Sequence, residues 1–166
     1  MGNTKITATE LATLYQNAVQ DEVGLLAKID EDNDIIFKHP DMGTMFFSVD
    51  AEKDPEYMML VFPNFANKDV LGLTREQLLI AINTVNTQNK AVKLGIRADT
   101  IGTTCEAIAT IECFLAGTNQ APSPELLKSI IKRNLSALRA GVRSLIKEAE
   151  AMTEQLSEGA VKQETI

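Results

Sequence analysis

The stretch Thr74–Ala98, TREQLLIAINTVNTQNKAVKLGIRA, decides the fold of this chain. Thr74 followed by Gln77 predicts a helix N-terminus, because each side chain can bond the other residue's backbone N–H. Apolar residues then recur at helical spacing and predict a buried face: Leu78, Ile82 and Val85, with weaker contributions from Leu79 and Ala81. Asn89 tolerates the left-handed conformation that ends a helix, and Val92–Ala98 alternates like a strand. The stretch predicts a central helix that turns into a strand.

The sequence before this stretch predicts one helix and a meander of short strands. Thr7 and Glu10 form a second capping box, which begins a helix over Thr7–Gln20. Four β-like runs follow, separated by turn-forming clusters: Leu25–Ile29, Ile35–Phe37, Thr44–Val49 and Tyr57–Phe62. Pro63 is expected to end the last of these strands, because proline lacks the N–H that a sheet requires. Loops are predicted over Ala51–Glu56 and Asn64–Leu73.

The sequence after it predicts a further strand and a long helix. Thr104–Leu115 suits either a helix or a strand, and its threonines and β-branched residues favour a strand that pairs with Val92–Ala98. Ser123 as N-cap and Pro124 as the first helical residue begin the longest helix, over 123–156. The predicted fold class is α+β, an antiparallel sheet packed by helices in the order α-βββ(β)-α-ββ-α. One domain covers 1–156, and a polar, flexible tail covers 157–166.

Composition limits the classes of function. The chain has 166 residues, 45% of them hydrophobic, which suffices for a core without disulfides or metal. Its net charge of −7 and its 5% of aromatic residues argue against nucleic-acid binding and against anionic membrane surfaces. The sequence shows neither a signal-peptide pattern nor an apolar stretch long enough to span a membrane. We therefore expect a cytoplasmic protein.

The residues that could carry chemistry form no recognised motif. Cys105 and Cys113 have no metal-site spacing with His39, the only histidine, and are interpreted as buried thiols. Glu106 and Glu112 are spaced like ordinary solvent-facing strand residues.

A calcium loop is suggested by the spacing of four aspartates: Asp30, Asp32, Asp34 and Asp41. However, Ile35 occupies the place where such a loop needs glycine, so a hairpin tip is the better interpretation. We expect no catalytic residues, no cofactor and no metal.

Two apolar groups exceed what a small core needs. The helix over 123–156 carries an apolar stripe longer than one small sheet, and several methionines lie among phenylalanines in the strands. The stripe suits either its own chain or a second subunit, and the methionines suit either a core or an adaptable binding surface. The predicted partner or dimer contacts are Leu138, Val142, Leu145, Met152, Met45 and Met58.

Four segments together resemble a known family. They are Asp34–Phe37, Met45–Val49, Glu56–Pro63 and, above all, Ala81–Asn86 before Val92–Leu94. The pattern Asn-x-Val-Asn at a helix end, followed by a Val-x-Leu strand, is similar to the YbjN-like group of the type III secretion chaperone-like fold. The resemblance implies a small, acidic, cytoplasmic bacterial protein that forms a homodimer and has no catalytic residues.

The function implied by this resemblance is protein binding. Relatives with this fold hold unfolded segments of secreted polypeptides or act as regulators, so we expect a chaperone-like or regulatory module with a polypeptide client or regulatory protein as partner. A free sheet edge could accept such a segment by strand addition. The alternative is a regulatory domain that senses a small molecule in an apolar pocket between the central helix and the sheet.

Overall fold

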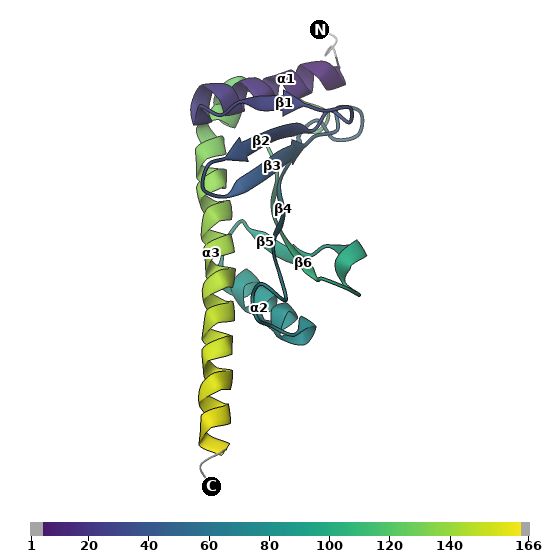
Figure 1. The fold of residues 1–166 in the computed structure, drawn as a ribbon. Coiled ribbons are helices and arrows are strands. Elements are labelled where there is room, and N and C mark those ends of the chain that lie inside the picture. The colour runs from purple at the N-terminus through teal and green to yellow at the C-terminus, as the bar shows by residue number, and fades with distance from the viewer. Residues whose placement is uncertain (1–4, 164–166) are drawn as a thin grey trace.

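The computed structural model describes residues 5–163, in which six antiparallel strands form a sheet (Figure 1). In chain order they are β1 (Ala27–Ile29), β2 (Ile35–His39), β3 (Gly43–Ser48), β4 (Tyr57–Asn67), β5 (Lys93–Ile96) and β6 (Glu106–Phe114). Their spatial order is β1-β2-β3-β4-β6-β5, so β6 lies between β4 and β5. The α+β fold class predicted from the sequence is confirmed, as is the preference for a strand over Thr104–Leu115.

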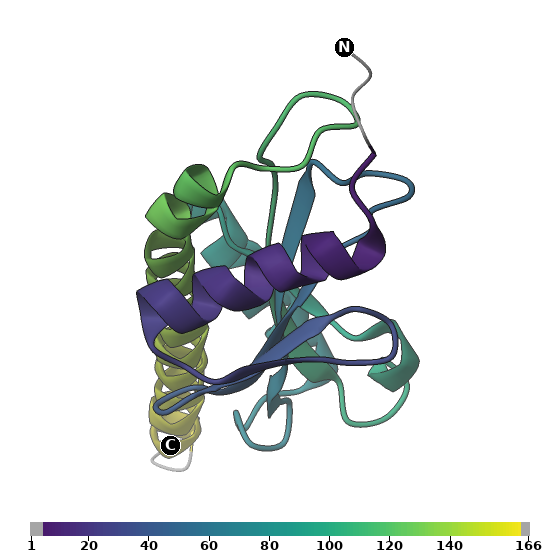
Figure 2. The ribbon, with the colours of Figure 1, turned by 90° about the horizontal axis from the view of Figure 1, so that it is seen from above.

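The helices pack on one face of the sheet. They are α1 (Ala8–Ala18) with its π-helical extension η1 (Val19–Val23), α2 (Arg75–Gln88) and α3 (Pro124–Gln163), and a 3-10 turn, η2 (Ala98–Thr100), follows β5. Figure 1 shows α3 running along the molecule, with α1 across its upper end and α2 beside its lower half. Seen from above, α1 crosses the strands (Figure 2). Alternate strand residues and all three helices therefore share one core.

Both predicted capping boxes are present. The N–H of Thr7 donates to Glu10 Oε2 at 2.8 Å, and the N–H of Thr74 donates to Gln77 Oε1 at 2.7 Å. In α2, Leu78, Ala81, Ile82 and Val85 are buried as expected. Leu79 is 46% exposed, so its predicted contribution to the buried face is wrong. Its position lies to one side of the stripe that faces the sheet.

The acidic end of α1 is tied to α3. Asp21 and Glu22, which lie in η1, oppose the helix dipole at this end. They form ion pairs with Lys128 and Lys132 of α3, at 2.7 and 3.5 Å respectively. Complementary charge on α3 thus compensates for acidic residues at a helix C-terminus.

The expectation that Pro63 ends its strand is wrong. β4 continues to Asn67, and its register with β6 shifts between Phe62 and Ala66. Asn64 there has a φ of 50°. A bulge leaves the proline without a required ladder bond, which is why the strand can continue. The predicted loop over Asn64–Leu73 begins later for the same reason.

Helix α3 packs its apolar stripe within its own chain. Leu127, Ile131, Leu138 and Leu145 are fully buried in the core. A Cβ added at Gly141 would lie 2.7 Å from Val92 Cγ1, so glycine permits the close approach of α3 to the segment that leads into β5. The helix continues past the predicted end at Leu156 to Gln163, so the tail expected over 157–166 is helical as far as it is described. Residues 164–166 lie outside the described residues.

Candidate functional site

The residues predicted to contact a partner lie mostly inside the fold. Met45, Met58, Leu138 and Leu145 are 0% exposed and Val142 is 9% exposed, all within the hydrophobic core. Met152 is half-buried against that core. None of the four fully buried side chains can touch a second molecule without rearrangement. The pleat of β4 explains part of this, because Met58 faces the core and its neighbour Met59 faces the other way.

Side-chain amides cover part of both sheet edges. At β5, the amide of Asn86 accepts from the N–H of Leu94 at 2.9 Å and donates to the carbonyl of Leu94 at 3.0 Å. At β1, the amide of Gln16 donates to the carbonyl of Ala27 at 2.9 Å. The Asn86 amide makes both bonds that a further strand would make at this residue, so strand addition at β5 would have to displace it.

The sheet face opposite the helices carries a second set of apolar side chains, which is separate from the core. These residues, called the outer-face cluster below, are Ile36, Phe46, Met59, Val61 and Ile108. Ile36 lies opposite Phe46 and Phe46 lies opposite Val61, so three strands contribute to one row. Phe114 stands beside them with 72% of its surface exposed, against the ring of Tyr57 at 5.2 Å. Val61 is 3% exposed and the other four residues of the cluster are half-buried, so Phe114 is the most exposed apolar side chain beside them.

The carboxylate of Glu112 stands beside the outer-face cluster on the same face of the sheet. Glu112 accepts hydrogen bonds from the Tyr57 hydroxyl at 2.9 Å and the Thr110 hydroxyl at 2.8 Å, and it pairs with Lys93. The Lys93 hydrogen bond is the main reason that the pKa of Glu112 lies below its ordinary value. Desolvation and then the bond to Glu112 raise the pKa of Tyr57 to about 12. Glu106 bonds a different cation, Arg97, so the two glutamates do not form a catalytic pair.

A second apolar site lies where β4 bulges. Residues three apart on a regular strand point to opposite faces, yet the rings of Phe62 and Phe65 stack with their centroids 5.5 Å apart. The register shift between Phe62 and Ala66 accounts for this, because a bulge redirects the side chains that follow it. β3 pairs with β4 only as far as Phe46 and Val61, so the two strands separate beside the bulge.

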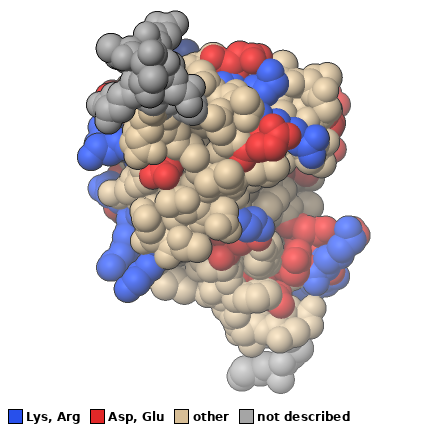
Figure 3. Space-filling view, turned by 90° about the horizontal axis from the view of Figure 1, so that it is seen from below, with Lys and Arg blue, Asp and Glu red and all other residues tan. Residues whose placement is uncertain are grey.

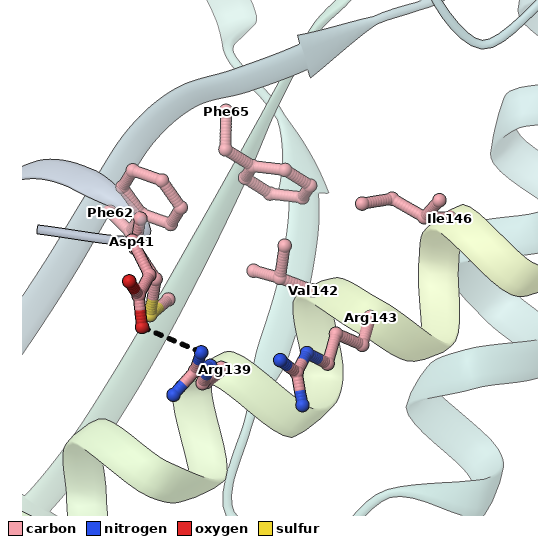
Figure 4. Close-up of a pocket in the computed structure, with 8 residues that line it drawn as sticks. Asp41, Phe62, Phe65, Arg139, Val142, Arg143 and Ile146 are labelled. Atoms are coloured by element: carbon pink, nitrogen blue, oxygen red, sulfur yellow. Dashed lines mark hydrogen bonds and ion pairs between the residues drawn. The ribbon is translucent and has the colours of Figure 1, made fainter.

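Helix α3 closes this opening into a pocket of about 290 Å³, called the bulge pocket below. Its lining residues are Asp41, Met42, Phe62, Phe65, Arg139, Val142, Arg143 and Ile146. Figure 4 shows the two rings across from α3, where Arg139 pairs with Asp41 at 2.7 Å. No residue pattern in the sequence predicted this pocket. The sequence feature that could have indicated the bulge is a proline within an otherwise strand-like run, Phe62-Pro63-Asn64-Phe65.

The cysteines and the histidine are not brought together by any described contact. Cys105 is buried, and its thiol bonds the Ile101 carbonyl. Cys113 is half-buried, and burial raises the pKa of its thiol, which lowers its reactivity. His39 accepts a bond from the N–H of Asp41 in the turn between β2 and β3.

The aspartate-rich segment forms a turn. Asp30 Oδ1 accepts the N–H groups of Asp32 and Asp34 at 3.0 and 2.9 Å, which closes the hairpin between β1 and β2. Within residues 5–163, no group of three or more metal-ligating side chains could hold an ion. No helix in the same range is long and apolar enough to cross a membrane.

Comparisons with known proteins support the fold. No protein-family model matches the chain, and no curated protein matches it significantly. A chain from the structure of the HopA1–SchA chaperone–effector complex is similar over 86% of this chain and 98% of its own length, with a TM-score of 0.55 and 15% sequence identity. At this identity the likeness shows the fold alone. The chain therefore has an α+β fold that also occurs in a complex between a chaperone and its effector.

Proposed function

We propose that this protein is a non-enzymatic, chaperone-like or regulatory module that binds an extended or partly unfolded polypeptide. The observation that carries the proposal is the outer-face cluster, which lies on the sheet face that no helix covers and whose members other than Val61 keep part of their surface accessible, in a fold shared with a chaperone–effector complex. An extended segment presents apolar side chains at alternate positions, which matches the spacing of such side chains on a sheet face. The narrower YbjN-like assignment and the cytoplasmic location are parts of the same proposal.

Binding across the sheet face is the mode that the geometry favours. Strand addition at β5 would have to displace the two bonds between Asn86 and Leu94. The outer-face cluster requires no such displacement, and Glu112 offers a fixed polar group beside it. Half-buried Met59 adds a flexible side chain that can adapt to different apolar partners.

The test is the binding of a permanently unfolded, fluorescently labelled polypeptide to the full chain, followed by fluorescence anisotropy. Phe46→Glu places a charge in the middle of the outer-face cluster. It should weaken binding by about tenfold or more, equivalent to about 1.4 kcal/mol. Asn17→Glu adds the same charge at an exposed position of α1 and serves as the matched control. Equal affinities for the wild type, Phe46→Glu and Asn17→Glu would contradict binding at this face, and no binding at all would contradict the function.

The homodimer is a separate part of the proposal, and its contact surface differs from the one the sequence suggested. Leu79 and Ile80 on α2 are 46% and 56% exposed. Figure 3 views the molecule from below and shows broad uncharged surface, with separate basic and acidic side chains within it and at its rim. Two copies of a chain with a net charge of −7 would repel each other least on such a face.

Light scattering at micromolar concentration tests the dimer. The wild type should have the mass of two chains, and Ile80→Glu should have the mass of one, because the substitution buries an unpaired charge in the contact. Asn17→Glu, on α1 and away from this helix, is the control for the added charge. A monomeric wild type would contradict the dimer and leave the polypeptide-binding proposal standing.

The alternative function, sensing of a small molecule between α2 and the sheet, has less support from the described residues. The buried face of α2 (Leu78, Ala81, Ile82 and Val85) belongs to the packed core. The apolar bulge pocket lies elsewhere, between α3 and β4. Polypeptide binding is therefore the function that the described surfaces support best.

A further inference from the structure

The bulge pocket combines an aromatic wall with a basic wall. Phe62 and Phe65 come from β4, and Val142 and Ile146 face them from α3. Arg139 and Arg143 stand one helical turn apart on α3 and line the same pocket (Figure 4). A group that enters here meets apolar surface on two sides and guanidinium groups beside it.

The two arginines differ in how their charge is satisfied. Arg139 pairs with Asp41 at 2.7 Å, and other basic residues of α3 pair with acidic residues of η1, as Lys128 does with Asp21. Arg143 makes no ion pair or hydrogen bond with any residue that the structure describes, although it lines a pocket in a chain of net charge −7. Its guanidinium group can therefore bind a carboxylate without losing an existing partner.

We propose that the bulge pocket binds a client residue pair, a large apolar side chain directly next to a glutamate or aspartate. The apolar side chain lies between the phenylalanine rings and Val142, and the carboxylate binds Arg143. This inference rests on the proposed function, because it names the kind of polypeptide segment that the protein selects. It adds a specificity that the outer-face cluster lacks, since apolar packing alone discriminates poorly between segments.

The size of the pocket favours a residue pair of a polypeptide over a free metabolite. Its volume of about 290 Å³ lies just below the range for small-molecule sites, about 300–1,000 Å³. A single aromatic side chain and one carboxylate fill such a space. The affinity for an isolated pair is expected to be weak, because the rest of the segment would bind elsewhere on the molecule.

The experiment uses the full chain, isotope-labelled for NMR, and hexapeptides blocked at both ends. Gly-Ser-Glu-Phe-Gly-Ser is the probe, and versions with Gln for Glu or Ser for Phe are its controls. The probe should shift the methyl signals of Val142 and Ile146 in a saturable manner. Loss of the carboxylate should weaken its binding by about threefold to tenfold, as expected for a partly exposed charged hydrogen bond.

Protein variants supply the second arm. Arg143→Gln should reduce the affinity for the Glu peptide to that for the Gln peptide, while Arg133→Gln, another exposed arginine of α3, should change neither. Phe65→Ala should lower the affinity for both the Glu and the Gln peptide. Unchanged backbone spectra would confirm that each variant is folded. 3-Phenylpropionate carries an aromatic ring and a carboxylate in one small molecule. Its binding tests whether the pocket prefers a free small molecule to a polypeptide segment.

The outcomes separate the two proposals. Equal binding of the Glu and Gln peptides would overturn the inference, as would binding of 3-phenylpropionate that depends on Arg143 and exceeds that of every peptide. In both cases binding of unfolded polypeptide at the outer-face cluster would still support the proposed function. If no peptide perturbs the pocket and no unfolded polypeptide binds anywhere, both fail.

Discussion

Tyr15 brings a hydroxyl group into the core without a hydrogen-bond partner among the described residues. Its side chain is 0% exposed, and its ring lies 5.3 Å from that of Phe47. Burial, more than the nearby Cys113, raises the pKa of this hydroxyl. A buried hydroxyl that loses water without gaining a partner costs about 1–3 kcal/mol. By contrast, the hydroxyl of Tyr57 on the outer face bonds Glu112.

Tyr15→Phe should therefore raise the free energy of unfolding by about 1 kcal/mol, because it removes the unpaired group and keeps the ring. Urea denaturation followed by circular dichroism measures the change. Tyr57→Phe is the matched control and should leave stability equal or slightly lower, since it deletes a bond that is made. A loss of stability in Tyr15→Phe would show that the hydroxyl has a partner in solution.

Glu112 should make stability depend on pH. Its pKa is lowered in the folded state, chiefly by Lys93, so its contribution is present above the unfolded pKa and disappears as pH falls through the folded pKa. Glu112→Gln should cost about 1 kcal/mol or less at neutral pH, because the side chain is partly exposed. The difference from wild type should shrink toward zero as the pH falls below 4.5, the ordinary pKa of a glutamate, and through the lower folded pKa. Urea titrations at neutral and acidic pH measure it, and a constant difference would contradict the assignment.

At the scale of elements, the link between α2 and β5 depends on one side chain. Asn86 extends from the last turns of α2 and bonds both backbone groups of Leu94, which otherwise face outward from an edge strand. The amide therefore fixes the helix against the strand and also occupies an edge position. The neighbouring Asn83 is exposed on the same helix and makes no such contact in the described structure.

Asn86→Ala should lower the free energy of unfolding by about 2 kcal/mol, since it leaves two backbone groups without their partner. Hydrogen exchange at the Leu94 amide should become faster than in the wild type. Asn83→Ala is the matched control and should change stability by less than about 0.5 kcal/mol. If exchange at Leu94 were equally slow in Asn86→Ala, the proposed edge protection would be wrong.

The sequence predicted the elements well where local chemistry decides them. Both capping boxes lie at helix starts, because the pairs Thr7–Glu10 and Thr74–Gln77 act within one turn. The predictions from the sequence were wrong where packing between distant segments determines the structure. Pro63 continues its strand only because a bulge against β6 removes the need for its N–H. The proline in a strand-like run marks an irregularity, but it does not distinguish a bulge from the end of a strand. The bulge pocket was missed for the same reason, since it needs α3 beside the bulge.

The partner residues show a different limit. Met58 and Met59 are neighbouring residues of the same type, but the pleat of the strand places Met58 in the core and Met59 on the opposite face of the sheet. A correct strand assignment does not say which face will be covered. That choice is made when the helices pack, so the outer-face cluster could be located only in the folded molecule.

At the scale of the whole molecule, one core joins the sheet to all three helices, and α3 contributes to it along most of its length. A chain that stops after Ala140 loses Val142, Leu145 and Ala149, which are buried. Each large deletion of this kind costs about 2–5 kcal/mol, against a total stability of about 5–15 kcal/mol.

This truncation at Ala140 should therefore abolish the cooperative thermal transition in circular dichroism. Truncation after Leu156 keeps every core residue that the structure describes and should leave the melting temperature within a few degrees of the full chain, as expected if residues beyond the predicted domain end at Leu156 act as a tail. A cooperative transition in the shorter chain would mean that the sheet, α1 and α2 form a core without α3. A large loss in the longer chain would place the domain boundary beyond Leu156.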